Sequence, residues 1–168
     1  FLTLWIPASF SDNIYFDVTV APREVVAGAP STLVIRYTNG TEENLRNARL
    51  TVTFPDHFNL QEVTLAGEPV DPDDILLGDI EVGASGSVRI RGVMFGDVGG
   101  EQVFLSSMFF VHGVEKDKPG LKTDAHSFSP VRSTLALELV LPDRLVAFQP
   151  VTGTVNYHNT GEIDFPEI

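Results

Sequence analysis

Residues Val20–Glu42 read VAPREVVAGAPSTLVIRYTNGTE, and residues Val140–Glu162 read VLPDRLVAFQPVTGTVNYHNTGE. A shift of 120 positions superimposes the two stretches without a gap and makes nine of their 23 positions identical. Ordinary residue frequencies give about one or two identities over such a length. The chain therefore contains an internal repeat, and its period fits one β-sandwich domain of about 100 residues plus a connector.

The repeat predicts how the chain is divided. We expect an apolar N-terminal segment at 1–13, an immunoglobulin-like sandwich at 14–130, and an incomplete second repeat at 131–168. The connector around Pro130 is short and contains a proline, which favours a semi-rigid joint. The first six residues, FLTLWI, are apolar but far fewer than the roughly 20 that a spanning helix needs. A first strand, an irregular start, the end of a membrane anchor and a strand donated to a neighbour all remain open for them.

Strands are indicated by residues that alternate between apolar and polar types. Leu33, Ile35 and Tyr37 alternate with more polar neighbours, as do Leu50 and Val52. Turn signals rich in Gly, Pro and Asn separate such runs, and no window shows an apolar period of 3.6 residues. The sequence predicts an all-β, immunoglobulin-like sandwich: one complete domain and the first two strands of a second copy.

The end of the first domain contains a polar stretch and, before it, a run of apolar residues. The polar stretch 115–122, EKDKPGLK, predicts a hairpin tip that is followed by a weak last strand around His126 and Phe128. The preceding run from Val103 to Val111 is apolar on both faces. If Val103, Leu105 and Phe109 fill the core, the opposite face is an apolar stripe formed by Phe104, Met108 and Phe110. Either loops or neighbouring residues cover this stripe, or it is a contact surface for another domain or subunit.

Charge and composition exclude several classes of protein. Eleven Lys and Arg against 23 Asp and Glu give a net charge of −12, which repels phosphate backbones and anionic lipid headgroups. We therefore expect no nucleic-acid partner, and contact with a membrane only through an anchor near the N-terminus. Cysteine is absent, so thiolate catalysis, thiolate metal sites and disulfides are excluded.

No catalytic motif is present, and we predict no enzyme. The chain has no Gly-rich phosphate loop, no nucleophile elbow and no paired metal-binding histidines, because its four histidines are dispersed (His57, His112, His126 and His158). The acidic cluster Asp71, Asp73 and Asp74 has the ligand type that calcium prefers, although it lacks the EF-hand pattern. A solvated loop is the simpler interpretation, and calcium is the only candidate cofactor.

Asn39 begins an Asn-Gly-Thr triplet that matches an N-glycosylation acceptor. The equivalent Asn159 is followed by Thr160 and Gly161 and does not match. A turn explains both asparagines better, since the side chain can bond nearby backbone and the residue tolerates a left-handed conformation. We expect Tyr37 and Tyr157, two residues earlier, to bury their rings.

The stretch Val25–Phe58, VVAGAPSTLVIRYTNGTEENLRNARLTVTFPDHF, resembles the strand, Asn turn and strand pattern of bacterial cell-surface immunoglobulin-like repeats. These include the cell-adhesion-related (CARDB-like) and conserved-repeat domains, and Leu76–Gly96 is similar to a later strand pair of theirs. The resemblance implies tandem modules behind a membrane anchor, and FLTLWIPASFSDNI resembles the end of such an anchor. Gly28 becomes Phe148 in the second copy, which predicts a different turn there.

The repeat, the acidic surface and the lack of catalytic motifs predict a non-catalytic structural or adhesion module on the cell surface. Its expected partners are neighbouring immunoglobulin-like domains or subunits and a surface protein ligand. One alternative is a self-assembling appendage subunit that is completed by strand exchange with a neighbour. Another is a carbohydrate-binding accessory module, which predicts a platform of exposed aromatic residues; the single tryptophan, Trp5, lies outside the predicted sandwich.

Overall fold

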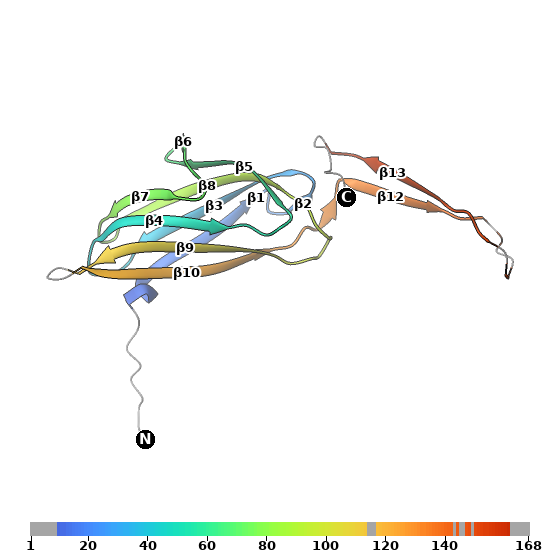
Figure 1. The fold of residues 1–168 in the computed structure, drawn as a ribbon. Helices are drawn as coiled ribbons and strands as arrows, with labels where there is room; N and C mark the ends of the chain where they lie inside the picture. The colour runs from blue at the N-terminus through green and yellow to red at the C-terminus, as the bar shows by residue number, and fades with distance from the viewer. Residues whose placement is uncertain (1–9, 114–116, 143, 145–146, 149, 162–168) are drawn as a thin grey trace, which may run out of the picture.

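The computed structural model describes residues 10–113, 117–142, 144, 147–148 and 150–161. Two antiparallel sheets face each other in the main body (Figure 1). The first has the order β1-β3-β8-β5-β6 and the second the order β10-β9-β4-β7. The strands of these two sheets are β1 Ile14–Ala21, β3 Pro30–Asn39, β4 Leu45–Thr53, β5 Phe58–Leu65, β6 Glu68–Pro69, β7 Ile75–Ile80, β8 Ser85–Met94, β9 Gln102–His112 and β10 Lys118–Phe128.

The remaining elements lie at the two ends of the sandwich. A 3-10 turn, η1 (Phe10–Asn13), precedes β1, and the short strand β2 (Val26–Ala27) pairs in parallel with β11 (Arg132–Ser133). Beyond β11, β12 (Leu135–Val140) and β13 (Thr154–Asn159) form a separate antiparallel hairpin that projects from the body (Figure 1). In the described residues, no helix has the length and apolar character needed to cross a membrane.

The strand order is that of an immunoglobulin-like sandwich. The run β1-β3-β8-β5 matches the A-B-E-D sheet of that fold, and β10-β9-β4 matches its G-F-C sheet. The additional strand β7 pairs with β4 at the edge of the second sheet. The prediction of an all-β, immunoglobulin-like sandwich is confirmed.

The core lies between the two sheets and is built from alternate residues of the central strands. Leu33 and Ile35 on β3 face Leu50 and Val52 on β4 across the sandwich as members of one buried apolar cluster. Phe104 of β9 contacts three other rings, with centroids 5.1 Å from Phe58, 5.9 Å from Phe128 and 6.1 Å from Phe54. Edge-to-face contacts of this kind add to the free energy gained from apolar burial.

The predicted hairpin tip at 115–122 lies largely within a strand, because β10 begins at Lys118 and runs for 11 residues. Residues 115 and 116 of this prediction lie outside the described residues. Pro119 is tolerated in this strand because β10 is the edge strand of its sheet and one side of its backbone needs no partner. The predicted last strand around His126 is therefore longer than its polar sequence indicates.

The buried ring of Tyr37 gives a pH-dependent prediction. Burial raises the pKa of the Tyr37 phenol above its ordinary value of 10.0. The phenol therefore ionises more readily in the unfolded chain, and its stabilising contribution is complete below about pH 10 and lost as the pH rises further. We expect urea unfolding from pH 9 to 11 to show a smaller loss of stability in Tyr37→Phe than in the wild type. Parallel pH profiles for the two proteins would contradict this assignment.

Candidate interaction surface

The β12–β13 hairpin repeats the pairing of β1 with β3. Leu135 pairs with Asn159 as Ile14 pairs with Asn39. The turn after the second strand is also similar, because the amide of Gly161 donates to Asn159 Oδ1 at 2.9 Å and that of Thr41 to Asn39 Oδ1 at 3.1 Å. The two hairpins therefore share their strand pairing and their closing turn.

The gapless shift of 120 positions does not hold along the whole hairpin. It relates β13 to β3, but the pairing relates β12 to β1 by 121 positions, so that Val140 occupies the place of Thr19. The shift changes by one residue because successive side chains along a strand point to opposite faces. A shift of 121 places Leu135, Leu137 and Leu139 on the face that holds Ile14, Phe16 and Val18 in the sandwich.

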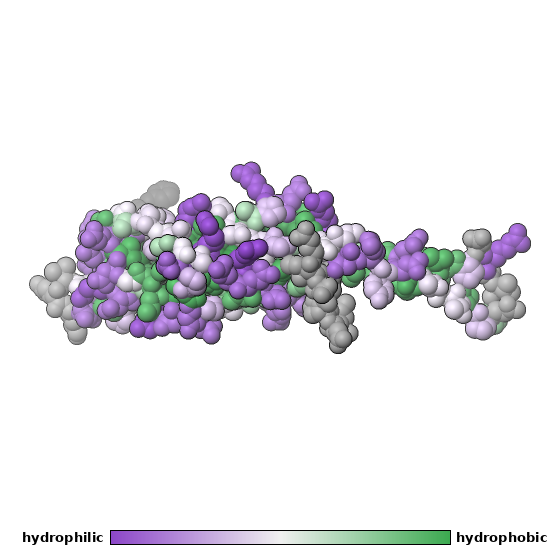
Figure 2. Space-filling view, turned by 90° about the horizontal axis from the view of Figure 1, so that it is seen from above, coloured by the Kyte–Doolittle hydropathy of each residue, from purple (hydrophilic) through white to green (hydrophobic). Residues whose placement is uncertain are grey.

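The face of the hairpin that corresponds to the inner face of the sandwich is uncovered. Val155 is 60% exposed and Tyr157 78% exposed, whereas the equivalent Ile35 and Tyr37 are 2% and 8% exposed. Leu137 and Leu139 are similarly exposed on the paired strand. Figure 2 shows apolar surface along this narrow part of the chain. The prediction that Tyr157 buries its ring is wrong, because no second sheet covers it in the described residues.

The opposite face of the hairpin also repeats the sandwich. Asn156 Nδ2 donates to Glu138 Oε2 at 3.2 Å. The equivalent cross-strand pair on the first sandwich is Arg36 and Asp17, whose nearest nitrogen and oxygen are 3.5 Å apart. Polar pairs therefore lie on the solvent side of both the β1–β3 pair and the β12–β13 hairpin. The leucine-rich side of the hairpin is the side that corresponds to the covered face of the sandwich.

The turn between β12 and β13 keeps one unusual feature of the first copy. Phe148 adopts a left-handed backbone with φ of 67°, and Gly28, 120 positions earlier, has φ of 82°. The replacement of Gly28 by Phe148 predicted a different turn, yet the backbone at this position is alike. A left-handed conformation disfavours a residue with a side chain by about 1–2 kcal/mol.

The connector at 130–134 forms backbone hydrogen bonds with both the sandwich and the β12–β13 hairpin. Gly99 N donates to Pro130 O at 2.7 Å, and Val131 N donates to Val25 O at 2.9 Å. Thr134 N donates to Ala27 O at 2.9 Å, while Thr134 O accepts from Thr160 N at 2.8 Å. One residue, Thr134, therefore links the backbone of the sandwich to that of the hairpin.

The predicted contact surface on β9 is wrong. Phe104, Met108 and Phe110 are 1%, 0% and 3% exposed and form part of the core. Their neighbours Val103, Leu105 and Phe109 point outward instead, with Phe109 50% exposed. The apolar stripe therefore lies on the opposite face of β9 from the one predicted.

Two neighbouring strands decide which face of β9 points inward. On β4, Leu50 pairs with Met108, and Leu50 is fully buried. On β10, Gly120 pairs with Phe110, and a Cβ atom at Gly120 would collide with the Phe110 ring. The glycine thus leaves room for a large inner side chain. Gly120 lies in the stretch predicted to be a hairpin tip, and its pairing with Phe110 is the signal that identifies the inner face.

The three aspartates of the candidate calcium site do not converge. Asp74 Oδ2 contacts Arg49 Nη1 at 2.9 Å, and Asp71 Oδ1 accepts from the amide of Asp73 at 3.0 Å. Across the described residues, no three His, Cys, Asp or Glu side chains are grouped as a metal site. The geometry fits the simpler interpretation, a solvated loop closed by its own hydrogen bonds.

Asn39 is a structural residue of the turn. It is buried, and its amide nitrogen donates to the carbonyl oxygens of Glu43 at 2.9 Å and Ile80 at 3.0 Å. Its Oδ1 accepts from the hydroxyl of Thr41 at 2.7 Å. These bonds confirm the expected role in the turn, although the backbone of Asn39 is not left-handed.

The comparisons with known proteins support the architecture. The chain resembles AvmM, a protein that catalyses macrocyclization in alchivemycin A biosynthesis, with a TM-score of 0.52 and 14% identity over 71% of this chain and 89% of that one. It also resembles BcpA, the major pilin subunit of Bacillus cereus, with a TM-score of 0.52 and 12% identity over 88% of this chain and 54% of the pilin. No protein-family model and no curated protein sequence matches the chain. At these identities the likeness shows the fold alone.

The similar structures support the architecture that the sequence resemblance implies, but not the family. The immunoglobulin-like architecture is shared with solved structures, but membership of the CARDB-like or conserved-repeat families has no matching model. One similar fold belongs to an enzyme and another to a structural subunit, so the fold does not decide between these functions. The uncovered hairpin face is the feature of this chain from which function is best argued.

Proposed function

We propose that this chain is a non-catalytic structural module from a tandem array of β-sandwiches at the cell surface. The β12–β13 hairpin is the observation that carries the proposal. In the proposed array, a further sheet covers Leu137, Leu139, Val155 and Tyr157 and a strand equivalent to β8 pairs with β13. Consecutive sandwiches are then joined end to end through Thr134.

The free energy of apolar burial supports a covering layer. Burying one large apolar side chain gains about 1.5–3 kcal/mol. Four such side chains on one hairpin face therefore favour a partner by roughly 6–12 kcal/mol before entropy is counted. A two-stranded hairpin is marginal in water by itself, and three or more strands with a common apolar face are needed for independent stability.

The surface location is supported by composition. The net charge of −12 and the absence of cysteine fit an acidic, disulfide-free exterior protein. A major pilin subunit has the same fold, which agrees with this location but does not establish it. Asn39, Tyr37 and the ring cluster around Phe104 have structural roles in the sandwich.

Strand exchange between subunits is the second candidate, because an uncovered hairpin can also enter a neighbouring molecule. In such an exchange β12 and β13 would replace β1 and β3 of another copy. Gly153 would then stand in the place of Leu33, which is 1% exposed in the core. The loss of that side chain leaves a cavity, which is destabilising by several kcal/mol. The repeat therefore favours a second sandwich of its own over exchange.

The carbohydrate-binding alternative has less support. Its expected platform of aromatic side chains is missing from the described residues, because the exposed rings lie on three different strands and one turn: Tyr15, Phe109, Tyr157 and Phe148. A flat array of sugar rings has no shared stacking surface there.

The location is tested by labelling intact cells that make this protein. An antibody raised against residues 14–128 is expected to label unpermeabilised cells, and external protease is expected to remove the signal. Labelling that appears only after permeabilisation would reject the surface assignment. An antibody to a cytoplasmic protein serves as the control for intact membranes.

A further inference from the structure

Two arginines stand side by side on the outer face of the first sheet. Arg89 and Arg91 are two residues apart on β8, where side chains of one face repeat about every 7 Å. β8 is a central strand, with β3 on one side and β5 on the other. Arg91 pairs across the sheet with Thr32 and Glu62, and Arg89 pairs with Val34 and Thr64.

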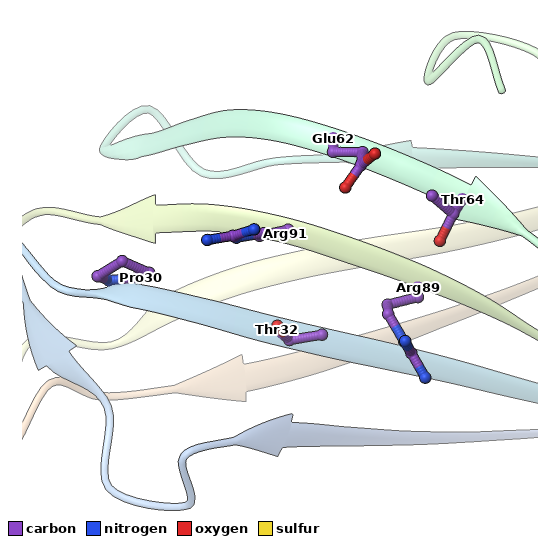
Figure 3. Close-up of a pocket in the computed structure, with 6 residues that line it drawn as sticks. All are labelled: Pro30, Thr32, Glu62, Thr64, Arg89 and Arg91. Carbon is purple, nitrogen blue, oxygen red and sulfur yellow. The ribbon is translucent and has the colours of Figure 1, made fainter. Parts of the chain in front are cut away.

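These residues line a shallow hollow of about 350 Å³, with Pro30 at one end. Figure 3 shows Glu62 and Thr64 extending from β5 towards β8, Arg91 lying along β8 on the side of Pro30, and Arg89 reaching towards β3. The floor of the hollow therefore carries two guanidinium groups, two hydroxyl groups and one carboxylate.

The guanidinium groups of Arg89 and Arg91 have no side-chain partner among the described residues. By contrast, Arg36, Arg46 and Arg49 on β3 and β4 each contact a carboxylate. With 23 Asp and Glu available, two adjacent arginines are still free to bind an outside ligand.

We propose that this hollow binds an extended acidic peptide segment whose carboxylates are two residues apart. Alternate side chains of an extended peptide leave its backbone at the same spacing of about 7 Å as the backbone positions of Arg89 and Arg91 on β8. A guanidinium fork matches a carboxylate through two parallel hydrogen bonds. The hydroxyls of Thr32 and Thr64 supply further donors, and Glu62 accepts from a backbone N–H of the ligand.

Chemistry favours a peptide over an acidic glycan. None of the residues that line the hollow is aromatic, so a sugar ring has no stacking surface. The main chain of β8 is already paired on both sides, so recognition comes from side chains and not from strand addition. The proposal does not depend on the tandem array, because the hollow lies within the first sandwich.

The expected affinity is low and depends on salt. The arginines are exposed, and the chain is acidic overall. At physiological ionic strength, salt largely screens the attraction between exposed charges that are more than about 8 Å apart. We expect dissociation constants on the order of 0.1–1 mM, and weaker binding as salt is raised.

The test is an NMR titration with an acetylated five-residue peptide that alternates glutamate and threonine. The control ligand carries glutamine in place of glutamate. We expect the acidic peptide to shift the amide signals of β3, β5 and β8, and the double variant Arg89→Gln/Arg91→Gln to weaken binding about tenfold or more. Arg36→Gln is the control, because it removes one positive charge from the same sheet outside the hollow and should leave binding within about twofold.

The proposed occupant is an acidic segment of a different protein, and binding of the acidic peptide by a strictly monomeric chain supports it. Self-association of the wild type that is lost in Arg89→Gln/Arg91→Gln would overturn this assignment in favour of a second copy. Equal binding of the glutamine peptide, or undiminished binding by a correctly folded Arg89→Gln/Arg91→Gln, would overturn the proposal. Tighter binding of a glucuronate oligosaccharide by the same arginines would overturn the peptide assignment in favour of a glycan.

Discussion

Replacing Phe104 by alanine is expected to lower the free energy of unfolding by about 3–5 kcal/mol. The ring is 1% exposed and lies among Phe54, Phe58 and Phe128, so its removal leaves a cavity bounded by other rings. Neighbouring side chains on two sheets hold the cavity open, because they cannot all move inward. Urea unfolding followed by circular dichroism measures this change.

The matched control is Phe109→Ala, on the same strand and on the opposite face. Phe109 is 50% exposed, so its removal is expected to lower stability by less than about 1 kcal/mol. Equal losses for the two variants, or a larger loss for Phe109, would show that the inner face of β9 is wrongly assigned. The comparison thus tests the correction of the predicted contact surface.

Asn39→Ala is expected to lower the free energy of unfolding by about 2–4 kcal/mol. The side chain joins the end of β3 to the carbonyl oxygens of Glu43, Ile80 and Glu81, and it accepts two hydrogen bonds from Thr41. Alanine would leave several of these buried groups without partners. Each unsatisfied group disfavours the folded state by about 1–3 kcal/mol unless water enters.

The second copy offers a control for this prediction in the same molecule. Asn159 makes the same bond to the backbone two residues later, but it ends a hairpin that no second sheet covers. Asn159→Ala is therefore expected to change the main unfolding transition by less than about 0.5 kcal/mol. A loss as large as that of Asn39→Ala would mean that the hairpin and the sandwich unfold as one unit.

The sequence predicts the class of fold well because the strands of a sandwich alternate apolar and polar residues over short stretches of chain. Leu33, Ile35, Leu50 and Val52 alternate on strands whose two faces differ, so their inner faces are readable. β9 is apolar on both faces, and no local pattern distinguishes Phe104 from Phe109. That choice depends on the pairing with Leu50, which is far away in the chain, and with Gly120 on the strand that follows.

The sequence predicted only part of the candidate interaction surface. The repeat of Tyr37 and Asn39 at Tyr157 and Asn159 identifies the second hairpin, but its gapless alignment misplaces β12 by one residue. The alternating leucines at 135, 137 and 139 carry the correct phase, since strand faces repeat every second residue. The hollow at Arg89 and Arg91 depends on three strands, so its geometry needed the folded chain.

The most direct test asks whether the hairpin accepts the strands of a second sandwich. The chain has no cysteine, so Val155→Cys and Ile35→Cys each place a single thiol at equivalent positions. Thiol labelling is then compared before and after residues 42–128 are joined behind Gly161. We expect Val155→Cys to react rapidly at first and on the order of a hundredfold more slowly once completed, close to Ile35→Cys. Continued rapid labelling at position 155 in the completed chain, with position 35 protected, would contradict the second sandwich.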